Sequence, residues 1–113
     1  MDLDIYQKKA AEFDLFEATA DLNATGFLEK ILGLVGEAGE TADKIKKILR
    51  DKGGEVSKED RIEIMKELGD ILWYVANMAR YFNIPLSEVA QNNIDKLASR
   101  KKRGKLQGQG DNR

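Results

Sequence analysis

The chain contains no cysteine and no histidine among its 113 residues. The absence of cysteine excludes disulfide bonds and thiolate chemistry, and the absence of histidine removes imidazole from metal binding and from acid–base catalysis. Any metal ion must therefore be held by carboxylate, amide, carbonyl or water oxygens, which favours Mg²⁺, Mn²⁺ or Ca²⁺ over zinc or copper. The Glu-x-x-His motif of ferritin-like di-iron proteins is excluded for the same reason.

Long apolar runs are also missing. No segment approaches the length of a membrane span, and the N-terminal MDLDIYQKK lacks the basic and apolar regions of a secretory signal, so we expect a cytoplasmic protein without a membrane partner. The formal net charge of -1 gives no general attraction to nucleic acid. The basic run RKKRGK at positions 100–105 supports at most weak, salt-sensitive binding of that kind.

Proline occurs only once, and 42% of the residues are hydrophobic and 35% charged, with strong helical periodicity. This composition predicts an all-α fold in a single domain over residues 1–103, followed by a flexible polar tail over residues 104–113. Ser57, with Asp60 three residues later, is a predicted helix N-cap. We expect four helices: about Leu3 to Asp21, about Phe27 to Asp51, Ser57 to about Phe82, and from Asn83 and Pro85 to about Arg100.

Two of these helices carry long apolar stripes. The second repeats apolar residues in steps of three and four, and the third is apolar around most of its circumference. We expect these stripes to form the core of a four-to-five-helix bundle. One subunit has little material to cover them, so we predict that homo-oligomerisation completes the bundle, with a tight monomeric bundle as the alternative. The stripe of the second helix consists of Leu28, Ile31, Val35, Ala38, Ala42, Ile45 and Leu49.

The chemistry is carried by two matched pairs of acids. Glu37 and Glu40 lie in GEAGE, and Glu67 and Asp70 lie in ELGD. The i, i+3 spacing puts each pair on one face of its helix, one turn apart. Two such helices side by side gather four carboxylates, whose repulsion requires a compensating cation. We therefore predict a site for Mg²⁺, with Mn²⁺ as a possible substitute, at these four residues.

The surface next to the first acid pair supports this interpretation. Lys44 and Lys47 share an arc of about 80° with the acids, and Gly33 and Gly36 continue it toward the N-terminus. A glycine inside a helix costs on the order of 1 kcal/mol relative to alanine, so close approach of a helix or ligand is expected here. The alternative is ordinary surface salt bridges, Glu40 with Lys44 and Asp43 with Lys47, each worth a few tenths of a kcal/mol.

Three blocks of the sequence resemble the MazG-like, all-α nucleoside triphosphate pyrophosphohydrolases. They are GLVGEAGETADKIKK, KELGDILWYVANMARYFNIPLSEVAQ and NIDKLASRKKRG, and the resemblance extends from Leu32 to about Gly104. It implies Mg²⁺-dependent cleavage of an NTP or dNTP between the α and β phosphates, in a dimer or tetramer. Glu37, Glu40, Glu67 and Asp70 match the family's E-x-x-E and E-x-x-D motif and would be its catalytic metal ligands. Many members carry a further glutamate where this chain has Gly36, so the number of metal ions and the group that activates water stay open.

The resemblance also implies substrate contacts. Lys44 and Lys47 are placed to meet the outer phosphates. Asn93, Lys96 and Arg100 match the family pattern N-x-x-K-L-x-x-R, which implies phosphate or sugar contacts. For Lys96 and Arg100 the alternative is a solvated helix end, where Arg100 interacts favourably with the C-terminal dipole. Tyr74, beside Trp73, is a candidate wall for the base, although an aromatic pair in so apolar a helix also suits a core. Nothing in the residues selects a canonical, damaged, dUTP or dCTP substrate. The alternative function is a non-catalytic helical oligomerisation or nucleotide-binding module.

Overall fold

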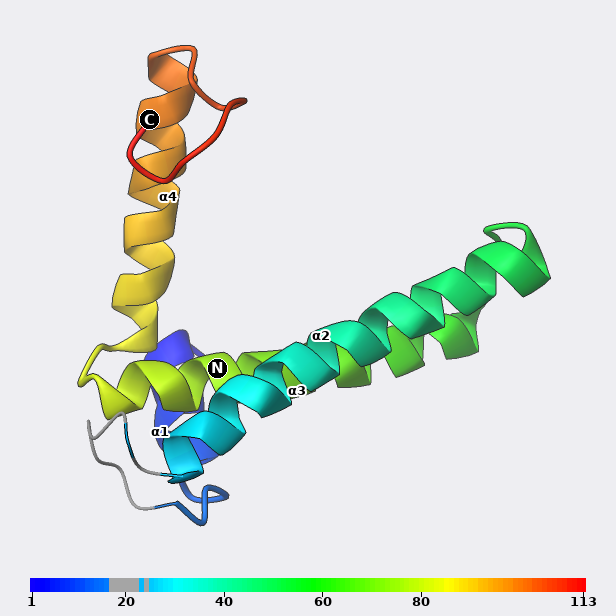
Figure 1. The fold of residues 1–113 in the computed structure, drawn as a ribbon, viewed down its shortest axis with the longest axis horizontal. Helices are drawn as coiled ribbons and strands as arrows, with labels where there is room; N and C mark the ends of the chain where they lie inside the picture. The colour runs from blue at the N-terminus through cyan, green and yellow to red at the C-terminus, as the bar shows by residue number, and fades with distance from the viewer. Residues whose placement is uncertain (17–22, 24) are drawn as a thin grey trace.

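The computed structural model describes residues 1–16, 23 and 25–113. Four helices occur in these residues: α1 (Leu3–Ala11), α2 (Thr25–Lys52), α3 (Lys58–Tyr81) and α4 (Leu86–Lys102) (Figure 1). The described part contains no strand, which confirms the predicted all-α class. Among its helices, none combines the length and the apolar character that a membrane span requires.

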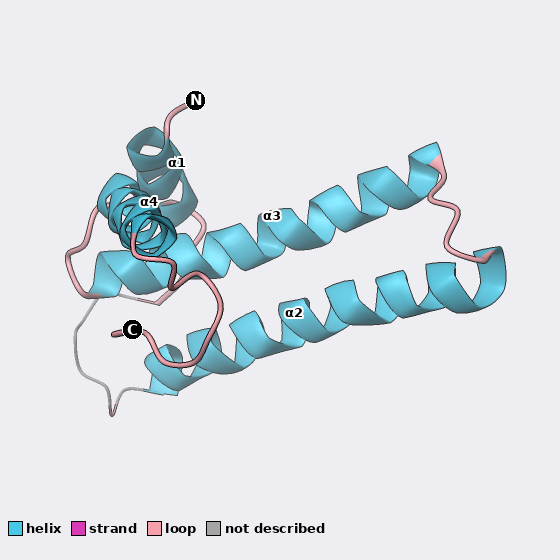
Figure 2. Cartoon of the chain, turned by 90° about the horizontal axis from the view of Figure 1, so that it is seen from above, coloured by secondary structure: helices cyan, strands magenta, loops and turns pink. Residues whose placement is uncertain are grey.

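Helices α2 and α3 run antiparallel as a long hairpin (Figure 2). Helix α2 ends at Gly53 and Gly54, whose φ angles of 61° and 87° are left-handed, and the Gly54 N–H donates to the Ile48 carbonyl at 3.2 Å. Helix α3 begins with the predicted capping box. Ser57 Oγ accepts from the Asp60 N–H at 3.1 Å, and Asp60 Oδ2 accepts from the Ser57 N–H at 3.0 Å. The predicted end of the second helix near Asp51 and the predicted start of the third helix at Ser57 are therefore confirmed.

Helix α1 is shorter than predicted, because it ends at Ala11 and residues 12–16 are not helical. Asp14 Oδ1 accepts from the Phe16 N–H at 3.0 Å, a local side-chain bond that competes with continuation of the helix. The prediction of a helix was therefore wrong over residues 12–16, and the rest of the predicted segment, residues 17–21, lies outside the described residues.

Gln7 of α1 joins this helix to the junction of α3 and α4. Its Nε2 donates to the carbonyls of Ala76 at 3.1 Å and Ile84 at 2.9 Å, and its Oε1 accepts from the Leu86 N–H at 3.0 Å. The break before α4 contains Asn83, with φ 57°, and Pro85 as the N-cap residue, as predicted. From this junction α4 points away from the α2–α3 hairpin instead of lying along it (Figure 1).

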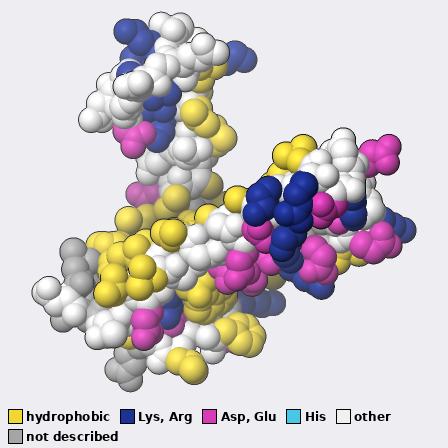
Figure 3. Space-filling model, turned by 45° about the vertical axis from the view of Figure 1, so that its right-hand side comes forward, with side chains coloured by type: hydrophobic (Ala, Val, Ile, Leu, Met, Phe, Trp, Pro, Cys, Tyr) yellow, Lys and Arg dark blue, Asp and Glu magenta, His cyan; other side chains and the backbone are white. Residues whose placement is uncertain are grey.

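The apolar stripes of α2 and α3 do not form a core within one chain. Val35 and Leu49 of α2 are 65% and 63% exposed, and Met65 and Leu68 of α3 are 65% and 53% exposed. Figure 3 shows apolar side chains gathered openly on one face of the molecule. The stripes are not covered within one chain, because α2 and α3 meet through their polar strips. This does not fit the alternative of a tight monomeric bundle, and completion of the bundle by homo-oligomerisation stays a prediction. Within the described residues, the buried apolar side chains are Ala10, Phe27, Ile48, Ala76, Ala79, Tyr81 and Leu86.

Candidate functional site

A close contact between one glycine and one aromatic ring brings α2 and α3 together. A Cβ built on Gly33 would lie 2.4 Å from the ring of Tyr74, so only glycine fits there without movement. Tyr74 is half-buried, and its ring meets that of Trp73 edge-on at 5.0 Å between centroids. Within one chain, Tyr74 therefore has a packing role between the helices. Gly36 and Gly39 have nothing within 4 Å of an added Cβ, so only Gly33 shows the predicted close approach.

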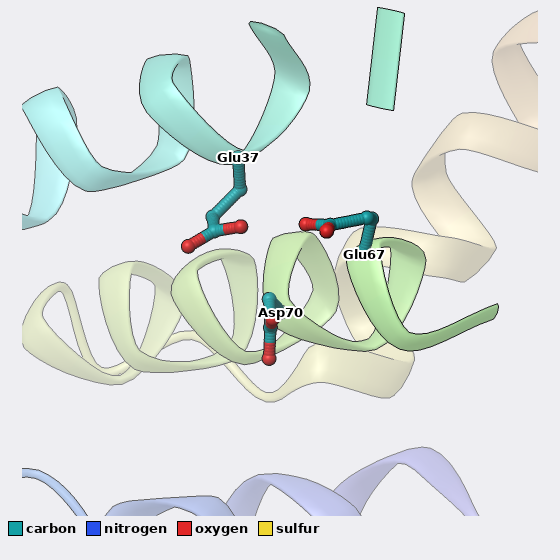
Figure 4. A group of neighbouring side chains, drawn as sticks. All are labelled: Glu37, Glu67 and Asp70. Carbon is teal, nitrogen blue, oxygen red and sulfur yellow. The ribbon is translucent and has the colours of Figure 1, made fainter. Parts of the chain in front are cut away.

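Three of the four predicted acids come together across this interface. Carboxylate oxygens of Glu37, Glu67 and Asp70 all lie within 4.8 Å of one another. Figure 4 shows Glu37 projecting from α2 toward α3, with Glu67 and Asp70 one turn apart on α3. Glu67 is buried, Glu37 is half-buried and Asp70 is exposed, so the cluster runs from the interface to the surface. The i, i+3 spacing on α3 allows both of its acids to belong to one cluster.

Two oxygens of this cluster, Glu37 Oε2 and Glu67 Oε2, are buried and have no hydrogen-bond partner. A buried carboxylate oxygen without a partner is costly. Burial raises the pKa of Glu37, and the nearby Glu67, Glu40 and Asp70 raise it further. Three clustered carboxylates with two unpartnered oxygens fit a hard divalent cation, since such ions take oxygen ligands and supply the missing positive charge.

Lys44 partly compensates this negative charge. Its Nζ lies 2.8 Å from Glu67 Oε1 and 3.3 Å from Glu63 Oε2. The hydrogen bond from Lys44 lowers the pKa of Glu67 and, in return, Glu67 raises the pKa of Lys44. The surface salt bridge between Lys44 and Glu40 that the alternative interpretation expects is replaced by a contact across the two helices. Glu63, which the sequence interpretation missed, is therefore a neighbour of the site.

The remaining predicted residues of α2 lie at the edge of the cluster. Glu40 is exposed and lies one turn after Glu37, close enough for its charge to contribute to the raised pKa of Glu37. Lys47 Nζ contacts Asp43 Oδ2 at 2.7 Å, as the salt-bridge alternative expects. Lys44 and Lys47 also line a cavity of about 230 Å³ between α2 and α3, together with Lys52 and Asp60. Asp51 and Glu63 line the same cavity, so basic and acidic side chains are mixed on this side of the cluster.

The three α4 residues predicted to contact the substrate, Asn93, Lys96 and Arg100, do not lie next to the acidic cluster of this chain. Helix α4 points away from the α2–α3 hairpin (Figure 1). Asn93 is exposed. Lys96 Nζ and Arg100 Nη2 both face Asp111 Oδ1, at 3.3 and 3.5 Å. The C-terminal residues 104–113 thus lie against α4, and their predicted flexibility stays a prediction.

A second polar cluster, centred on Asp14, was missed. The Asp14 side chain is fully buried, forms an ion pair with Lys30 at 3.1 Å, and accepts from Arg80 Nη2 at 2.8 Å and from the Tyr81 hydroxyl. Burial alone would raise the pKa of Asp14, but the bonds from Tyr81 and from the Phe16 N–H, together with Lys30, outweigh it and hold the pKa below its ordinary value. A lysine among apolar residues in FLEKIL was the only signal for this cluster in the sequence.

The fold and the cluster define a class: helical proteins with a cluster of carboxylates between two antiparallel helices. The MazG nucleotide pyrophosphohydrolase domain matches residues 26–104, and the chain belongs to this family. The "Gene 37 protein" of Mycobacterium phage L5 is 48% identical over 114 residues, with all of both chains covered. No solved structure matches the chain significantly.

Proposed function

We propose that the chain hydrolyses a nucleoside triphosphate between the α and β phosphates, releasing a nucleoside monophosphate and pyrophosphate, with Mg²⁺ as the natural cation and Mn²⁺ as a substitute. The observation that carries the proposal is the cluster of Glu37, Glu67 and Asp70, with its two unpartnered buried oxygens. Membership of the MazG family supports the reaction type. The predicted cytoplasmic location stays a prediction.

In this proposal Glu37, Glu67 and Asp70 hold the cation, which when bound offsets the charge of the phosphates and polarises the α-phosphoryl group. Glu40 is exposed, one turn after Glu37 and outside that three-carboxylate cluster, although its side chain reaches Glu67 and helps to lower the pKa of that carboxyl. It is therefore the carboxylate best placed to accept the proton of the attacking water. A Glu40→Gln variant is expected to retain metal binding and lose turnover, whereas Glu67→Gln is expected to lose both.

The cavities on either side of the acids suggest how the substrate lies. Lys44 and Lys47 line the cavity toward the closed end of the hairpin, next to the turn between α2 and α3, where they would receive the leaving pyrophosphate. On the other side, Phe13, Phe16 and Trp73 line a cavity of about 440 Å³. Aromatic walls suit a nucleobase. We therefore place the phosphates over the lysines and the base toward Trp73.

Lys46 provides a matched control for Lys47 in this arrangement. Both lysines contact Asp43, at 3.0 and 2.7 Å, but only Lys47 lines the cavity. Lys47→Met is expected to raise KM for the triphosphate several-fold, while Lys46→Met leaves it unchanged. Equal effects of the two substitutions would contradict the placement of the phosphates.

The exposed apolar stripes support a homo-oligomer, either a dimer or a tetramer. Leucine, valine and methionine side chains that are more than half exposed on two adjacent helices form a surface that a second copy of the same helices can cover. Burial of such side chains contributes about 25 cal/mol per Å² of apolar area.

Metal binding can be tested apart from turnover. Mg²⁺ is expected to raise the melting temperature of the wild-type protein, and this shift should disappear in Glu37→Gln and Asp70→Asn. Glu55→Gln, an exposed acid in the turn between α2 and α3, is the control and should keep the shift. A purely structural role for the acids predicts no Mg²⁺ effect in any of these proteins, and nucleotide binding without hydrolysis would favour the binding-module alternative.

A further inference from the structure

Lys44 of α2 reaches across the helix interface and joins two carboxylates of α3. Its Nζ lies 2.8 Å from Glu67 Oε1 and 3.3 Å from Glu63 Oε2. Glu63 and Glu67 are four residues apart on α3, so they lie on one face of that helix, one turn from each other. The ammonium is thus held between two acids of the neighbouring helix.

The two carboxylate oxygens of Glu67 have different surroundings. Oε1 contacts the Lys44 ammonium, whereas Oε2 is buried without a hydrogen-bond partner. Glu67 is only 7% exposed, and Figure 4 shows its carboxylate pointing toward that of Glu37. Glu67 therefore lies between a cation that is already in place and the three-carboxylate cluster that we propose to hold Mg²⁺.

This arrangement resembles a two-ion site in which a side chain takes one of the two positions. In two-metal hydrolytic sites, ions about 3.5–4 Å apart stabilise both the attacking and the leaving oxygens. A carboxylate has two oxygens and can bind one cation on each. Mg²⁺ is commonly held by one or two carboxylates together with water and phosphate oxygens. Glu67 Oε1 and Glu63 Oε2 would supply two such ligands, but the Lys44 ammonium lies between them.

The charge of Lys44 opposes a second divalent ion at this position. An ammonium is a compact point charge, and it repels another cation strongly at close range. Hydrogen bonds to Glu67 and to Glu63 raise the pKa of Lys44, so the ammonium stays charged at neutral pH. Lys44 also lines the cavity of about 230 Å³ in which we place pyrophosphate, where its charge is available to phosphate oxygens.

We propose that Lys44 is a built-in cation that takes the place of a second divalent ion, so that the site binds one divalent ion per chain. The proposal rests on the metal-binding part of the proposed function. It also gives Glu63 a part in the site, because Glu63 helps to hold the ammonium on Glu67. Removal of the ammonium should leave Glu63 and Glu67 as a pair of ligands for a second ion.

Mn²⁺ binding to the full chain tests this proposal without turnover. Calorimetry counts the bound ions, and electron paramagnetic resonance detects two neighbouring Mn²⁺ ions through their magnetic coupling. We expect one Mn²⁺ per wild-type chain and two coupled Mn²⁺ ions in Lys44→Met. Lys44→Arg keeps the positive charge and should bind one. If Lys44→Met does not fold, Lys44→Gln, which keeps a hydrogen-bond donor, makes the same test.

Two controls locate the second ion. Lys66 Nζ contacts Glu63 Oε1 at 2.7 Å, so Lys66→Met removes an equal charge beside Glu63 and leaves the contact of Lys44 with Glu67 in place. This variant should still bind one Mn²⁺. The addition of Glu63→Gln to Lys44→Met removes one ligand of the new position and should return the count to one.

The possible results separate this proposal from the proposed function. Two Mn²⁺ ions per wild-type chain, or a single ion in both Lys44→Met and Lys44→Gln, would overturn the role of Lys44. The expected counts without hydrolysis of any triphosphate would support the role of Lys44 and contradict the proposed function. Hydrolysis by a wild-type chain that binds two Mn²⁺ ions would do the reverse, and a wild-type chain that binds no Mn²⁺ would overturn both.

Discussion

Substitution of Asp14 by alanine tests the cluster that joins the segment after α1 to α2 and α3. Asp14 has a side chain with 0% exposure, its partner Lys30 is 11% exposed and Arg80 is 26% exposed. The substitution leaves the Lys30 ammonium without its counter-ion and the Tyr81 hydroxyl without its acceptor. Removal of one member of a buried ion pair costs about 3–5 kcal/mol.

The partial exposure of Arg80 lets water replace some of what that side chain loses, so we expect the low end, about 3 kcal/mol. For a chain of this size this corresponds to a fall in melting temperature of about 12 °C. Urea unfolding at one fixed protein concentration, followed by circular dichroism, measures the free-energy change. Asp51→Ala, which removes an exposed partner of Arg50, is the control and should change stability by less than about 0.5 kcal/mol. A loss below about 1 kcal/mol for Asp14→Ala would refute the reasoning, since even an ordinary hydrogen bond is worth that much.

Three further outcomes follow from the same structure. The pKa of Asp14 lies below its ordinary 3.8 in the folded protein, so its contribution to stability is full above pH 3.8 and is lost as the pH falls through the lowered pKa. The stability advantage of wild type over Asp14→Asn should therefore shrink as the pH is lowered below 3.8 in acid titrations of unfolding. Gly33→Ala should destabilise by about 1–3 kcal/mol in urea unfolding, because its Cβ would meet the Tyr74 ring at 2.4 Å. Val35→Lys should shift the protein toward monomer in light scattering, and a wild-type monomer at micromolar concentration would contradict the oligomer.

The α2–α3 hairpin could be predicted from sequence because its signals are local. Paired glycines end one helix and the Ser57 capping box starts the next, so both boundaries depend on a few adjacent residues. The end of α1 could not be predicted in this way. Asp14 lies beyond the end of α1 and forms ion pairs with Lys30 and Arg80, which are distant in sequence. Helical periodicity carries no information about such partners.

The acidic part of the candidate site could be predicted from sequence because its signal is also local. The i, i+3 spacing identified Glu37, Glu67 and Asp70 as neighbours, since spacing fixes the face of a helix. Spacing does not decide how far a helix lies from its neighbour, so the distance of Lys96 and Arg100 on α4 from the acids was not foreseen. The contact of Lys44 with Glu63 also depends on the register between α2 and α3, which the sequence does not show.

Triphosphate hydrolysis at the acidic cluster is tested most directly by product analysis with the purified protein, Mg²⁺ and each of the common NTPs and dNTPs. We predict that at least one of them yields a nucleoside monophosphate and pyrophosphate in equal amounts, and that Glu37→Gln abolishes this release while the protein stays folded. The substrate that reacts fastest would also identify the base and sugar preference. No pyrophosphate from any of the nucleotides, or orthophosphate as the product, would contradict the central claim.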